Sequence, residues 1–450
     1  MTTSLSGFPE FLPAQRAVEL AVLDRLRTTF ELHGFTSVET RAVEPLEQML
    51  RKGEIDKEVY VLRRLHADDT AGDSGLGLHF DLTVPFARYV LDNAGHLEFP
   101  FRRYQIQKVW RGERPQTGRY REFTQADIDV IGRDELPFWH DVEVARVMAE
   151  ALSALDFLPP LRLQINNRKL LQGFCEGIGV ADASEVSAAL RVIDRLDKVT
   201  PAQVAEQLRG EAGLSDEQSA LLLRLADIRT SDATFADSVR ALGVRSDLLE
   251  QGLDELAAVV DGCRGVDSDR VSVEADLRIA RGLDYYTGTV FETRMAGYES
   301  LGSICSGGRY DSLASDARAT YPGVGISLGV TRLLMPLIQD GVLAGSRTVP
   351  SAVLVALPND DDRIRCDDIA RRLRARGIAV EVAPAAQKFG KQIRYAERRG
   401  IPFVWFPGAD GSSDEVRDIR SGEQVAADPA SWSPPEVDLR PQVDVNREQV

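Results

Sequence analysis

The sequence contains few residues of the types that bind metals or form disulfide bonds. Its 450 residues include only 4 cysteines and 5 histidines. The cysteines lie far apart and show no paired spacing, so the sequence predicts neither a zinc ribbon nor a disulfide framework. The scattered histidines form no metal-binding pattern. We therefore predict no metal site built from protein ligands, and we expect Cys175, Cys263, Cys305 and Cys366 to be ordinary buried thiols.

Long apolar segments are also absent. No stretch reaches the roughly 18 consecutive apolar residues that a membrane-spanning helix requires. The N-terminal sequence MTTSLSGFPEFLPAQ lacks the basic and apolar regions of a signal peptide. We therefore expect a cytoplasmic protein with no membrane partner.

Several common catalytic motifs are missing as well. The sequence has no G-x-x-x-x-G-K-[ST] loop, no H-E-x-x-H pair and no nucleophile elbow. It therefore predicts neither a Walker-type ATPase nor a zinc hydrolase. The string GVGIS at residues 323–327 does not continue as a G-x-G-x-x-G fingerprint, so a dinucleotide-binding fold is not supported.

What is present is the composition of a folded protein with an uneven charge distribution. Hydrophobic residues at 43% and charged residues at 28% are typical of globular proteins, and the length allows two or three domains. The net charge of −16 disfavours indiscriminate binding of nucleic acid. Residues 102–121 nevertheless hold seven basic residues and one acidic residue, and residues 371–399 hold nine and two. These segments are either phosphate-binding sites or solvated helix faces.

The spacing of apolar residues predicts a strand-rich N-terminal region. Residues 14–33 have helical spacing and end at Gly34, a natural C-cap. Alternating runs at residues 101–112 and 119–132 flank the loop ERPQTG and predict an antiparallel hairpin with arginines at both shoulders. Further strands are predicted at residues 35–45, 76–86 and 271–280, and a strand entering a helix at residues 323–338.

The composition changes twice along the chain. From about residue 161 to 263 helical periodicity dominates, which predicts a helical insertion. After a small, polar linker, strands and helices alternate within about 60 residues, which predicts an α/β domain built on βαβ crossovers. The predicted organisation is a strand-rich domain at residues 1–160 and 264–340, an insertion at 161–263, an α/β domain at 348–430 and an irregular, Pro-rich tail at 431–450.

Four arginines are candidates for contacts with phosphate, because a guanidinium makes planar, bidentate hydrogen bonds to phosphate oxygens. They are Arg111, Arg119, Arg281 and Arg332. Phosphoryl and nucleotidyl transfer depends mostly on positioning and charge neutralisation, which fits the lack of an obvious nucleophile. Arg332 taken alone is equally consistent with a helix cap. The common ligand we predict is a polyphosphate together with a small polar molecule.

Five segments together resemble one family along nearly the whole chain. The segments are RGLDYY at 281–286, SGGRYDSL at 306–313, VWRGERPQTGRYREFTQADIDVIG at 109–132, GVGISLGVTRLL at 323–334 and GFTSVETRAVEP at 34–45. The first two look like the signature segments of histidyl-tRNA synthetases. The other three are similar to motifs 2, 3 and 1 of class II aminoacyl-tRNA synthetases, of which motif 1 is the weakest signal.

The resemblance implies a fold and an activity. The implied fold is an α+β catalytic domain with a central antiparallel sheet, carrying a helical insertion and followed by a C-terminal α/β anticodon-binding domain. The implied protein is a homodimer with motif 1 at its interface. It activates histidine with ATP and Mg²⁺ to histidyl-adenylate and transfers the histidyl group to the 3′ end of tRNA(His).

The resemblance also implies a histidine site. Asp129 and Tyr286 match the imidazole-binding positions, since the imidazole offers one N–H donor and one acceptor at neutral pH, and Tyr285 is a further implied histidine contact. The α-ammonium would be bound by Asp81, Thr83 and Gln125. Residue 81 is an aspartate here, whereas many bacterial members of the family carry glutamate at this position. The segment DLTVPFARY looks archaeal or eukaryotic, whereas ERPQTG looks bacterial. Taken singly, Asp129 is also consistent with a surface carboxylate and the tyrosines with strand aromatics.

The implied ATP site uses the arginines. Arg111 and Arg281 would contact the α-phosphate as catalytic residues, with Arg281 also beside the histidine, and Arg119 and Arg332 would contact the terminal phosphates. Phe123 would stack on adenine and Glu113 would accept a hydrogen bond from its amino group. Phe123 is equally consistent with a core residue.

The implied tRNA contacts are Arg114 and Gln116 in the hairpin loop, with the C-terminal domain meeting the anticodon. The helical insertion has no implied role beyond a hypothesis of contact with the acceptor arm.

An alternative function from another class is a catalytically inactive, histidine-binding paralogue that acts as a regulatory subunit of ATP phosphoribosyltransferase. Such relatives typically lack the C-terminal domain and have degraded motifs, whereas this chain has both intact.

Overall fold

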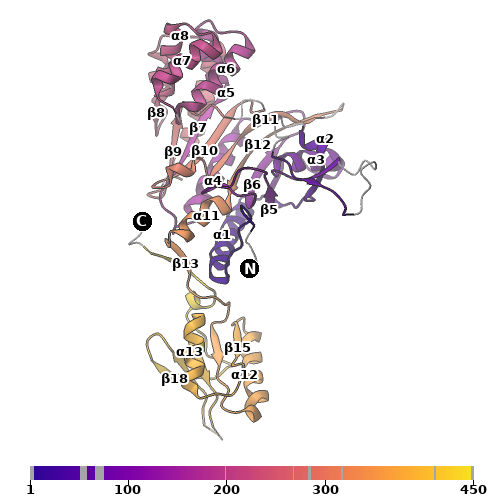
Figure 1. The fold of residues 1–450 in the computed structure, drawn as a ribbon, viewed down its shortest axis with the longest axis vertical. Helices are drawn as coiled ribbons and strands as arrows, with labels where there is room; N and C mark the ends of the chain where they lie inside the picture. Colours follow the sequence, from indigo (N-terminus) through magenta and orange to yellow (C-terminus); the bar gives the residue numbers. More distant parts are fainter. Residues whose placement is uncertain are drawn as a thin grey trace. The chain divides into compact units, whose positions relative to one another are not determined.

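The computed structural model describes residues 5–50, 58–65, 75–197, 199–266, 268–281, 285–315, 318–409 and 412–446 (Figure 1). The chain divides into two compact units, Met1–Pro9 with Leu23–Pro336 and Glu10–Val22 with Leu337–Val450. Two helices, α1 (Pro13–Leu32) and α11 (Val330–Gln339), each contribute residues to both units. Among the described residues no helix is long and apolar enough to cross a membrane.

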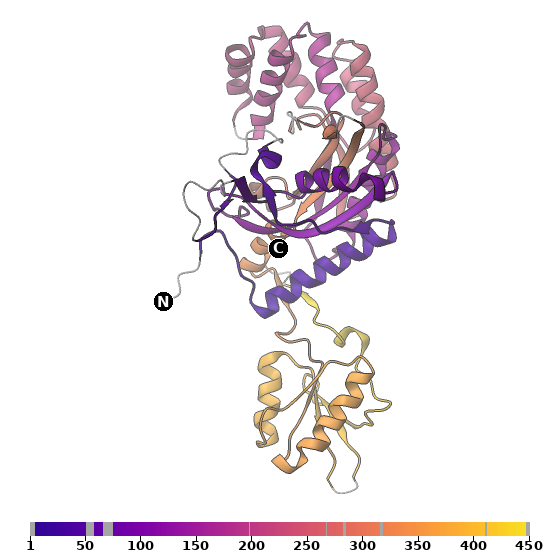
Figure 2. The same ribbon diagram turned by 90° about the vertical axis from the view of Figure 1, so that its right-hand side faces the viewer.

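A nine-stranded sheet forms the centre of the first unit (Figure 2). Its order is β1-β5-β6-β12-β11-β10-β7-β9-β8, and all neighbours are antiparallel except β1 with β5 and β7 with β9. The strands are β1 (Thr36–Ser37), β5 (Phe101–Trp110), β6 (Glu122–Ile131), β7 (Leu161–Asn167), β8 (Arg229–Thr230), β9 (Val271–Asp276), β10 (Thr289–Met295), β11 (Cys305–Ser315) and β12 (Thr320–Gly329). The predicted central sheet is therefore confirmed, with two parallel pairs in an otherwise antiparallel arrangement.

The predicted hairpin is the pair β5 and β6, whose register matches Phe101 with Ile131 and Trp110 with Glu122. Residues directly opposite one another in an antiparallel pair lie on the same face. This register therefore places Arg103 opposite Asp129. Because side chains alternate along a strand, Gln125, Asp127 and Asp129 share the same face of β6.

Two strand predictions near the N-terminus were only partly right. Residues 35–45 form two short strands, β1 and β2 (Val43–Pro45), and residues 76–86 contain only β4 (Leu76–Leu78) before α3 (Thr83–Asn93) begins. Just before this helix, whose N-cap is Leu82, an Asp81 carboxylate oxygen accepts a hydrogen bond from the backbone N–H of Val84, at 3.1 Å. The alternating pattern of residues 76–86 therefore continues into a helix and not into a long strand. A small sheet of β2, β4 and β3 (Val61–Leu62) and the short α2 (Leu46–Met49) complete this region.

The helical segment begins at residue 168, so the prediction of an insertion starting at residue 161 was wrong for its first seven residues. Those residues form β7, buried between β10 and β9. Helix α4 (Trp139–Ser153) lies before β7 in the sequence. The helices after β7 are α5 (Arg168–Gly177), α6 (Ala183–Ile193), α7 (Pro201–Ala212), α8 (Asp216–Ala226), α9 (Phe235–Arg240) and α10 (Asp247–Gly262). Helices α5 to α8 gather at the end of the sheet that carries β7, β8 and β9 (Figures 1 and 2).

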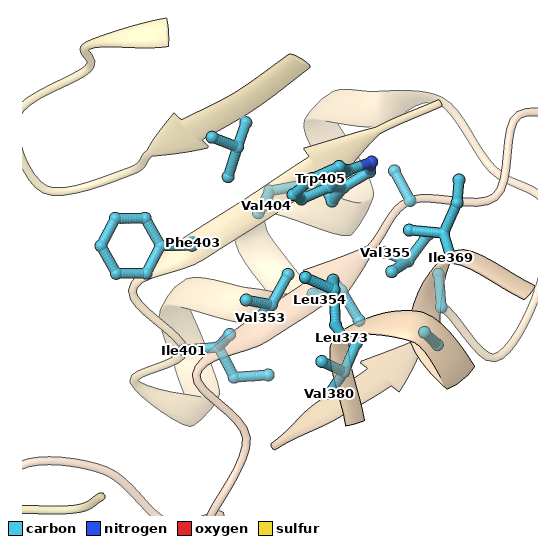
Figure 3. Packing of buried hydrophobic residues seen from close by; sticks show 14 of the residues in the cluster. Val353, Leu354, Val355, Ile369, Leu373, Val380, Ile401, Phe403, Val404 and Trp405 are labelled. Carbon is cyan, nitrogen blue, oxygen red and sulfur yellow. The ribbon is translucent and has the colours of Figure 1, made fainter. Parts of the chain in front are cut away.

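The second unit contains the predicted α/β domain. Its sheet has the order β15-β14-β16-β17-β18, with β14 parallel to both β15 and β16. The elements are β14 (Val353–Val355), α12 (Arg363–Ala375), β15 (Val380–Val382), α13 (Phe389–Arg399), β16 (Phe403–Phe406), β17 (Glu415–Asp418) and β18 (Gln424–Ala426). Figure 3 shows Leu354, Leu373 and Trp405 within its apolar core, all fully buried.

The tail at residues 431–450 was predicted to be irregular, and this is wrong in part. It contains β19 (Val443–Val445), which pairs with β13 (Leu343–Gly345) in an antiparallel sheet. Arg420 also binds the tail through two hydrogen bonds of 2.8 Å to Asp438. The chain returns to pair with β13 despite its prolines, which lie before the strand. All four cysteines are buried free thiols, as predicted.

Candidate functional site

Two adjoining pockets lie against β6, β11 and β12, and each has a volume of about 80 Å³. We call the first the acidic pocket; its lining includes Asp81, Thr83, Asp127, Asp129, Tyr285, Tyr286, Tyr310 and Gly325. We call the second the arginine pocket; its lining includes Glu113, Gly118, Arg119, Tyr120, Phe123, Ser303, Gly329 and Arg332. The two pockets share Arg111, Gln125, Ser306 and Ser327. A ligand that filled both would therefore pass Arg111.

Asp129 lines the acidic pocket and forms an ion pair with a buried arginine. Its carboxylate is 2.7 Å from the Arg103 guanidinium, which is fully buried and lies 4.3 Å from the centre of the Phe86 ring. The Tyr310 hydroxyl donates a hydrogen bond of 2.7 Å to the same carboxylate. Asp129 is 3% exposed, so it is not a surface carboxylate. Arg103 supplies the counter-charge that a buried carboxylate requires.

Three other predicted residues lie together in the acidic pocket. Asp81 and Gln125 are buried, at 4% and 6% exposure, and Thr83 lies at the start of α3. Gln125 donates from its amide nitrogen to the Ser327 hydroxyl at 2.6 Å. Its amide oxygen is buried without a hydrogen-bond partner among the described residues. A hydrogen-bond donor on a ligand would satisfy that oxygen.

Tyr285 and Tyr286 also line the acidic pocket, with their ring centres 4.1 Å apart. Burial raises the pKa of the Tyr285 hydroxyl, which therefore stays protonated. Residues 282–284, between these tyrosines and Arg281, lie outside the described residues.

Glycines of two sequence motifs make room for the acidic pocket. A Cβ atom at Gly325 would lie 2.1 Å from an Asp129 carboxylate oxygen. A Cβ atom at Gly308 would lie 2.7 Å from the ring of Tyr286. Any side chain at either position would displace a residue that lines the pocket.

Among the residues that sequence reasoning did not assign to the site are Asp127, Tyr310 and Ser327 in the pocket lining, and Arg103, which pairs with Asp129 behind it. Asp127 is 2% exposed, and burial raises its pKa to about 7. Alternation along β6 could have identified it, because Gln125 and Asp129 flank it at spacings of two. Arg103 could be found only from the register of β5 against β6.

In the arginine pocket, Arg111 lies between two aromatic rings. Its guanidinium is 4.7 Å from the centre of the Phe80 ring and 5.1 Å from that of Phe123, and its Nε donates to the Phe80 carbonyl at 3.1 Å. Glu113 lies 3.7 Å from Arg111 and 3.3 Å from Arg119. The Glu58 carboxylate also interacts electrostatically with Glu113 and with both guanidinium groups.

Arg332, near the start of α11, adds a further cation to this pocket. Its side chain donates to the backbone carbonyl of Leu301. Burial, together with the charges of Arg119 and Arg111, lowers the pKa of Arg332 to about 10. A guanidinium whose charge is disfavoured in this way is stabilised by an incoming anion.

Arg281 does not line either pocket. It lies in a third pocket of about 180 Å³, where its Nε is 2.8 Å from Glu292 and 3.2 Å from Asp194. We call this the outer pocket; it is lined mainly by arginines and acidic residues. The charge of Arg281 still contributes to the lowered pKa of Arg332, so the two guanidinium groups interact electrostatically.

The two residues predicted to contact tRNA lie on the loop between β5 and β6. Arg114 and Gln116 are both exposed. The backbone of Gln116 pairs with that of Arg119 through hydrogen bonds of 3.2 and 2.8 Å. This short bridge fixes the loop beside the arginine pocket.

Two family models together match most of the chain. The family model described as Histidyl-tRNA synthetase matches residues 7–333, and the model described as Anticodon binding domain matches residues 352–431. Curated proteins named histidine–tRNA ligase from Micrococcus luteus and Cutibacterium acnes are 60% and 58% identical, each match covering 98% of both chains.

A crystal structure of histidyl-tRNA synthetase from a Nostoc species is similar, with a TM-score of 0.84 and 35% identity over 95% of this chain and 97% of that one. A Bacillus halodurans protein, titled as an ATP phosphoribosyltransferase regulatory subunit/histidyl-tRNA synthetase, has a TM-score of 0.72 but only 21% identity over 88% of this chain and 96% of that one. That likeness concerns the fold alone. The close relatives therefore support the ligase over the regulatory-subunit alternative.

The Arg103–Asp129 pair generates a stability prediction. Replacing Arg103 by methionine leaves the buried Asp129 carboxylate without its counter-charge, which lowers the free energy of unfolding by about 3–5 kcal/mol. Urea unfolding followed by circular dichroism measures this loss. The double variant Arg103→Met with Asp129→Asn removes both charges and should recover part of it. A single-variant loss below about 1 kcal/mol would show that the pair behaves like a surface ion pair.

Proposed function

The chain belongs to the histidyl-tRNA synthetase family and is a histidine–tRNA ligase, and from that premise we propose how its pockets divide the substrates. The acidic pocket binds histidine and the arginine pocket binds ATP. The observation that carries this proposal is the shared lining, because Arg111 and Gln125 belong to both pockets. The histidine carboxylate and the α-phosphate would meet at that boundary.

The acidic pocket has the polar groups that histidine needs. Asp129 accepts a hydrogen bond from the imidazole N–H, and the Tyr286 hydroxyl adapts to the other ring nitrogen. Asp81, Thr83 and Gln125 hold the α-ammonium, with Tyr285 closing the pocket beside them. An apolar amino acid would leave these buried groups unpaired, which disfavours it by roughly 10⁴-fold or more.

The arginine pocket neutralises the phosphates of ATP. A carboxylate oxygen of histidine attacks the α-phosphorus in line, a new O–P bond forms, and the bond to the pyrophosphate oxygen breaks. Arg111 and Arg281 stabilise the charge on the α-phosphate, and Arg119 and Arg332 hold the terminal phosphates. Phe123 stacks on adenine and Glu113 accepts from its amino group, which requires Glu113 to loosen its contacts with Arg111 and Arg119.

Arg281 must also change partners to act at the α-phosphate. Its present contacts with Glu292 and Asp194 hold it in the outer pocket. A phosphate offers a guanidinium a bidentate contact, which is strong enough to compete with these carboxylates. We therefore assign Arg281 to the catalytic step through movement of its side chain.

The family uses ATP, and we propose Mg²⁺ as its counter-ion. No group of three or more His, Cys, Asp or Glu side chains that could hold a metal occurs in the part of the chain that the structure describes. Mg²⁺ suits this situation, because it is commonly bound through substrate phosphates with few protein ligands. The ion would neutralise the phosphates.

The second step transfers the histidyl group to tRNA(His). A terminal ribose hydroxyl attacks the adenylate carbonyl, the ester bond forms, and AMP leaves. Gln116 and Arg114 contact the end of the acceptor arm from the β5–β6 loop, and the unit that contains residues 352–431 meets the anticodon. The helices between Arg168 and Gly262 are assigned to the acceptor arm.

We further propose that the protein works in the cytoplasm as a homodimer, with residues 34–45 at the interface. Support for the dimer comes from the resemblance of these residues to motif 1. Sedimentation velocity should give the mass of two chains, and an active species with the mass of one chain would contradict the dimer.

Histidine-dependent exchange of pyrophosphate into ATP tests the first step. Replacing Arg281 by alanine should lower the exchange rate by roughly 10²-fold or more, because a group that stabilises the transition-state charge is lost. The matched control is Asp194→Asn, which removes one carboxylate that holds Arg281 in the outer pocket. That variant should exchange at least as fast as the wild type. Equal losses in both variants would assign Arg281 to folding rather than catalysis.

Gln116→Ala separates the two steps. Gln116 is exposed and lines neither pocket, so pyrophosphate exchange should be unchanged while charging of tRNA(His) falls about tenfold. Both rates are measured on the same preparation. A parallel loss of exchange would place Gln116 in the ATP site instead.

A further inference from the structure

Asp127 is a buried acidic residue of the acidic pocket that has no role in the mechanism above. It lies on β6 between Gln125 and Asp129 and is 2% exposed. Its register partner on β12 is Ser327. Since side chains at spacings of two share one face of a strand, the three β6 residues form a row along the pocket.

One oxygen of this carboxyl group is unsatisfied. The Ser327 hydroxyl hydrogen-bonds to the Asp127 side chain. The Oδ1 atom is buried and has no hydrogen-bond partner among the described residues. Buried polar atoms in proteins are nearly always paired, so an unpaired one at a pocket wall indicates a missing ligand group or a proton.

Asp127 shares the nearby cation, Arg103, with Asp129. Acidic neighbours are Asp81, before α3, and Asp129 on β6, while Arg103 on β5 is already paired with Asp129. Tyr285 faces the group from the segment before β10 and Cys305 faces it from β11, while Tyr310 lines the same pocket. Burial raises the pKa values of these three groups, so all of them are neutral.

Burial also raises the pKa of Asp127 itself to about 7; Arg103 opposes the rise, and Asp129 and Asp81 add to it. A carboxyl with a raised pKa is neutral below that pKa and ionised above it. Two of the three pocket acids, Asp81 and Asp129, already have a backbone N–H or a guanidinium beside them. Asp127 is therefore the acid whose charge a ligand would change most.

Resting on the assignment of the acidic pocket to histidine, we infer that Asp127 is a further residue that positions the amino acid: its carboxyl group is partly protonated in the ligand-free protein at pH 7 and becomes fully ionised when the α-ammonium of histidine binds. The proton passes to solvent and the ammonium keeps its own. The α-ammonium is the cation concerned, because the imidazole of histidine is mostly neutral at pH 7. Histidine binding thus carries a linked proton release.

Isothermal titration calorimetry of histidine binding, in two buffers with different protonation enthalpies, measures this release. Wild type should release roughly half a proton more per histidine at pH 7 than Asp127→Asn, which has no carboxyl to ionise. The difference isolates Asp127, because protonation of free imidazole contributes equally to both. Above pH 8 the variant should bind roughly tenfold to a hundredfold more weakly, and its affinity should approach that of the wild type near pH 6.

Two controls separate this role from a structural one. Asp134→Asn makes the same change at an exposed turn with a φ of 64°, which asparagine tolerates, and should release as many protons as wild type. Imidazolepropionate lacks the ammonium group and should bind without the proton that Asp127 contributes. If Asp127→Asn does not fold, Ser327→Ala removes a hydrogen bond to the carboxylate and should move the midpoint of proton release to higher pH.

Equal proton release by wild type and Asp127→Asn would overturn the inference while leaving the histidine pocket intact. Proton release with imidazolepropionate equal to that with histidine would overturn it as well, because the ammonium would then play no part. Absence of histidine binding by wild type would contradict the pocket assignment itself, and the inference with it.

Discussion

The ion pair between Arg103 and Asp129 constrains the whole site. A guanidinium and a carboxylate buried side by side are tolerated only when each compensates the other, so β5 and β6 must keep the register that places them opposite. Phe86 covers the guanidinium, and Tyr310 donates to the carboxylate. Gly325 completes the arrangement, because any side chain there would occupy the position of the Asp129 carboxylate. The pocket walls are therefore set by one electrostatic requirement.

The two adjoining pockets also differ in charge. Acidic side chains gather on one side of Arg111 and guanidinium groups on the other. An amino acid with a cationic end and a reacting carboxylate fits this polarity in one orientation only, with its carboxylate toward the arginines. Arg111 itself is held by the Phe80 carbonyl and two aromatic rings, so it is positioned before any phosphate arrives. Such preorganisation is what electrostatic catalysis requires.

The sequence predicted the parts that depend on local pattern or on quoted motifs. The β5–β6 hairpin, the alternating strands and helices after residue 352 and the gathering of Asp81, Gln125, Asp129 and Tyr286 in one pocket followed from such patterns. Non-local partners could not be predicted. Arg103 became part of the site only through strand register, and Arg281 contacts Asp194, 87 residues away in sequence. The strand β7 was mistaken for helix because its neighbours in sequence are helical, whereas its neighbours in space are strands.

The most direct test of the account is a crystal structure with histidine and an ATP analogue that cannot release pyrophosphate. The account predicts the imidazole beside Asp129, the α-ammonium near Asp81 and Gln125, and the triphosphate in the arginine pocket with Arg281 moved from Glu292 to the α-phosphate. Histidine bound elsewhere, or a triphosphate that does not contact Arg111, would contradict it.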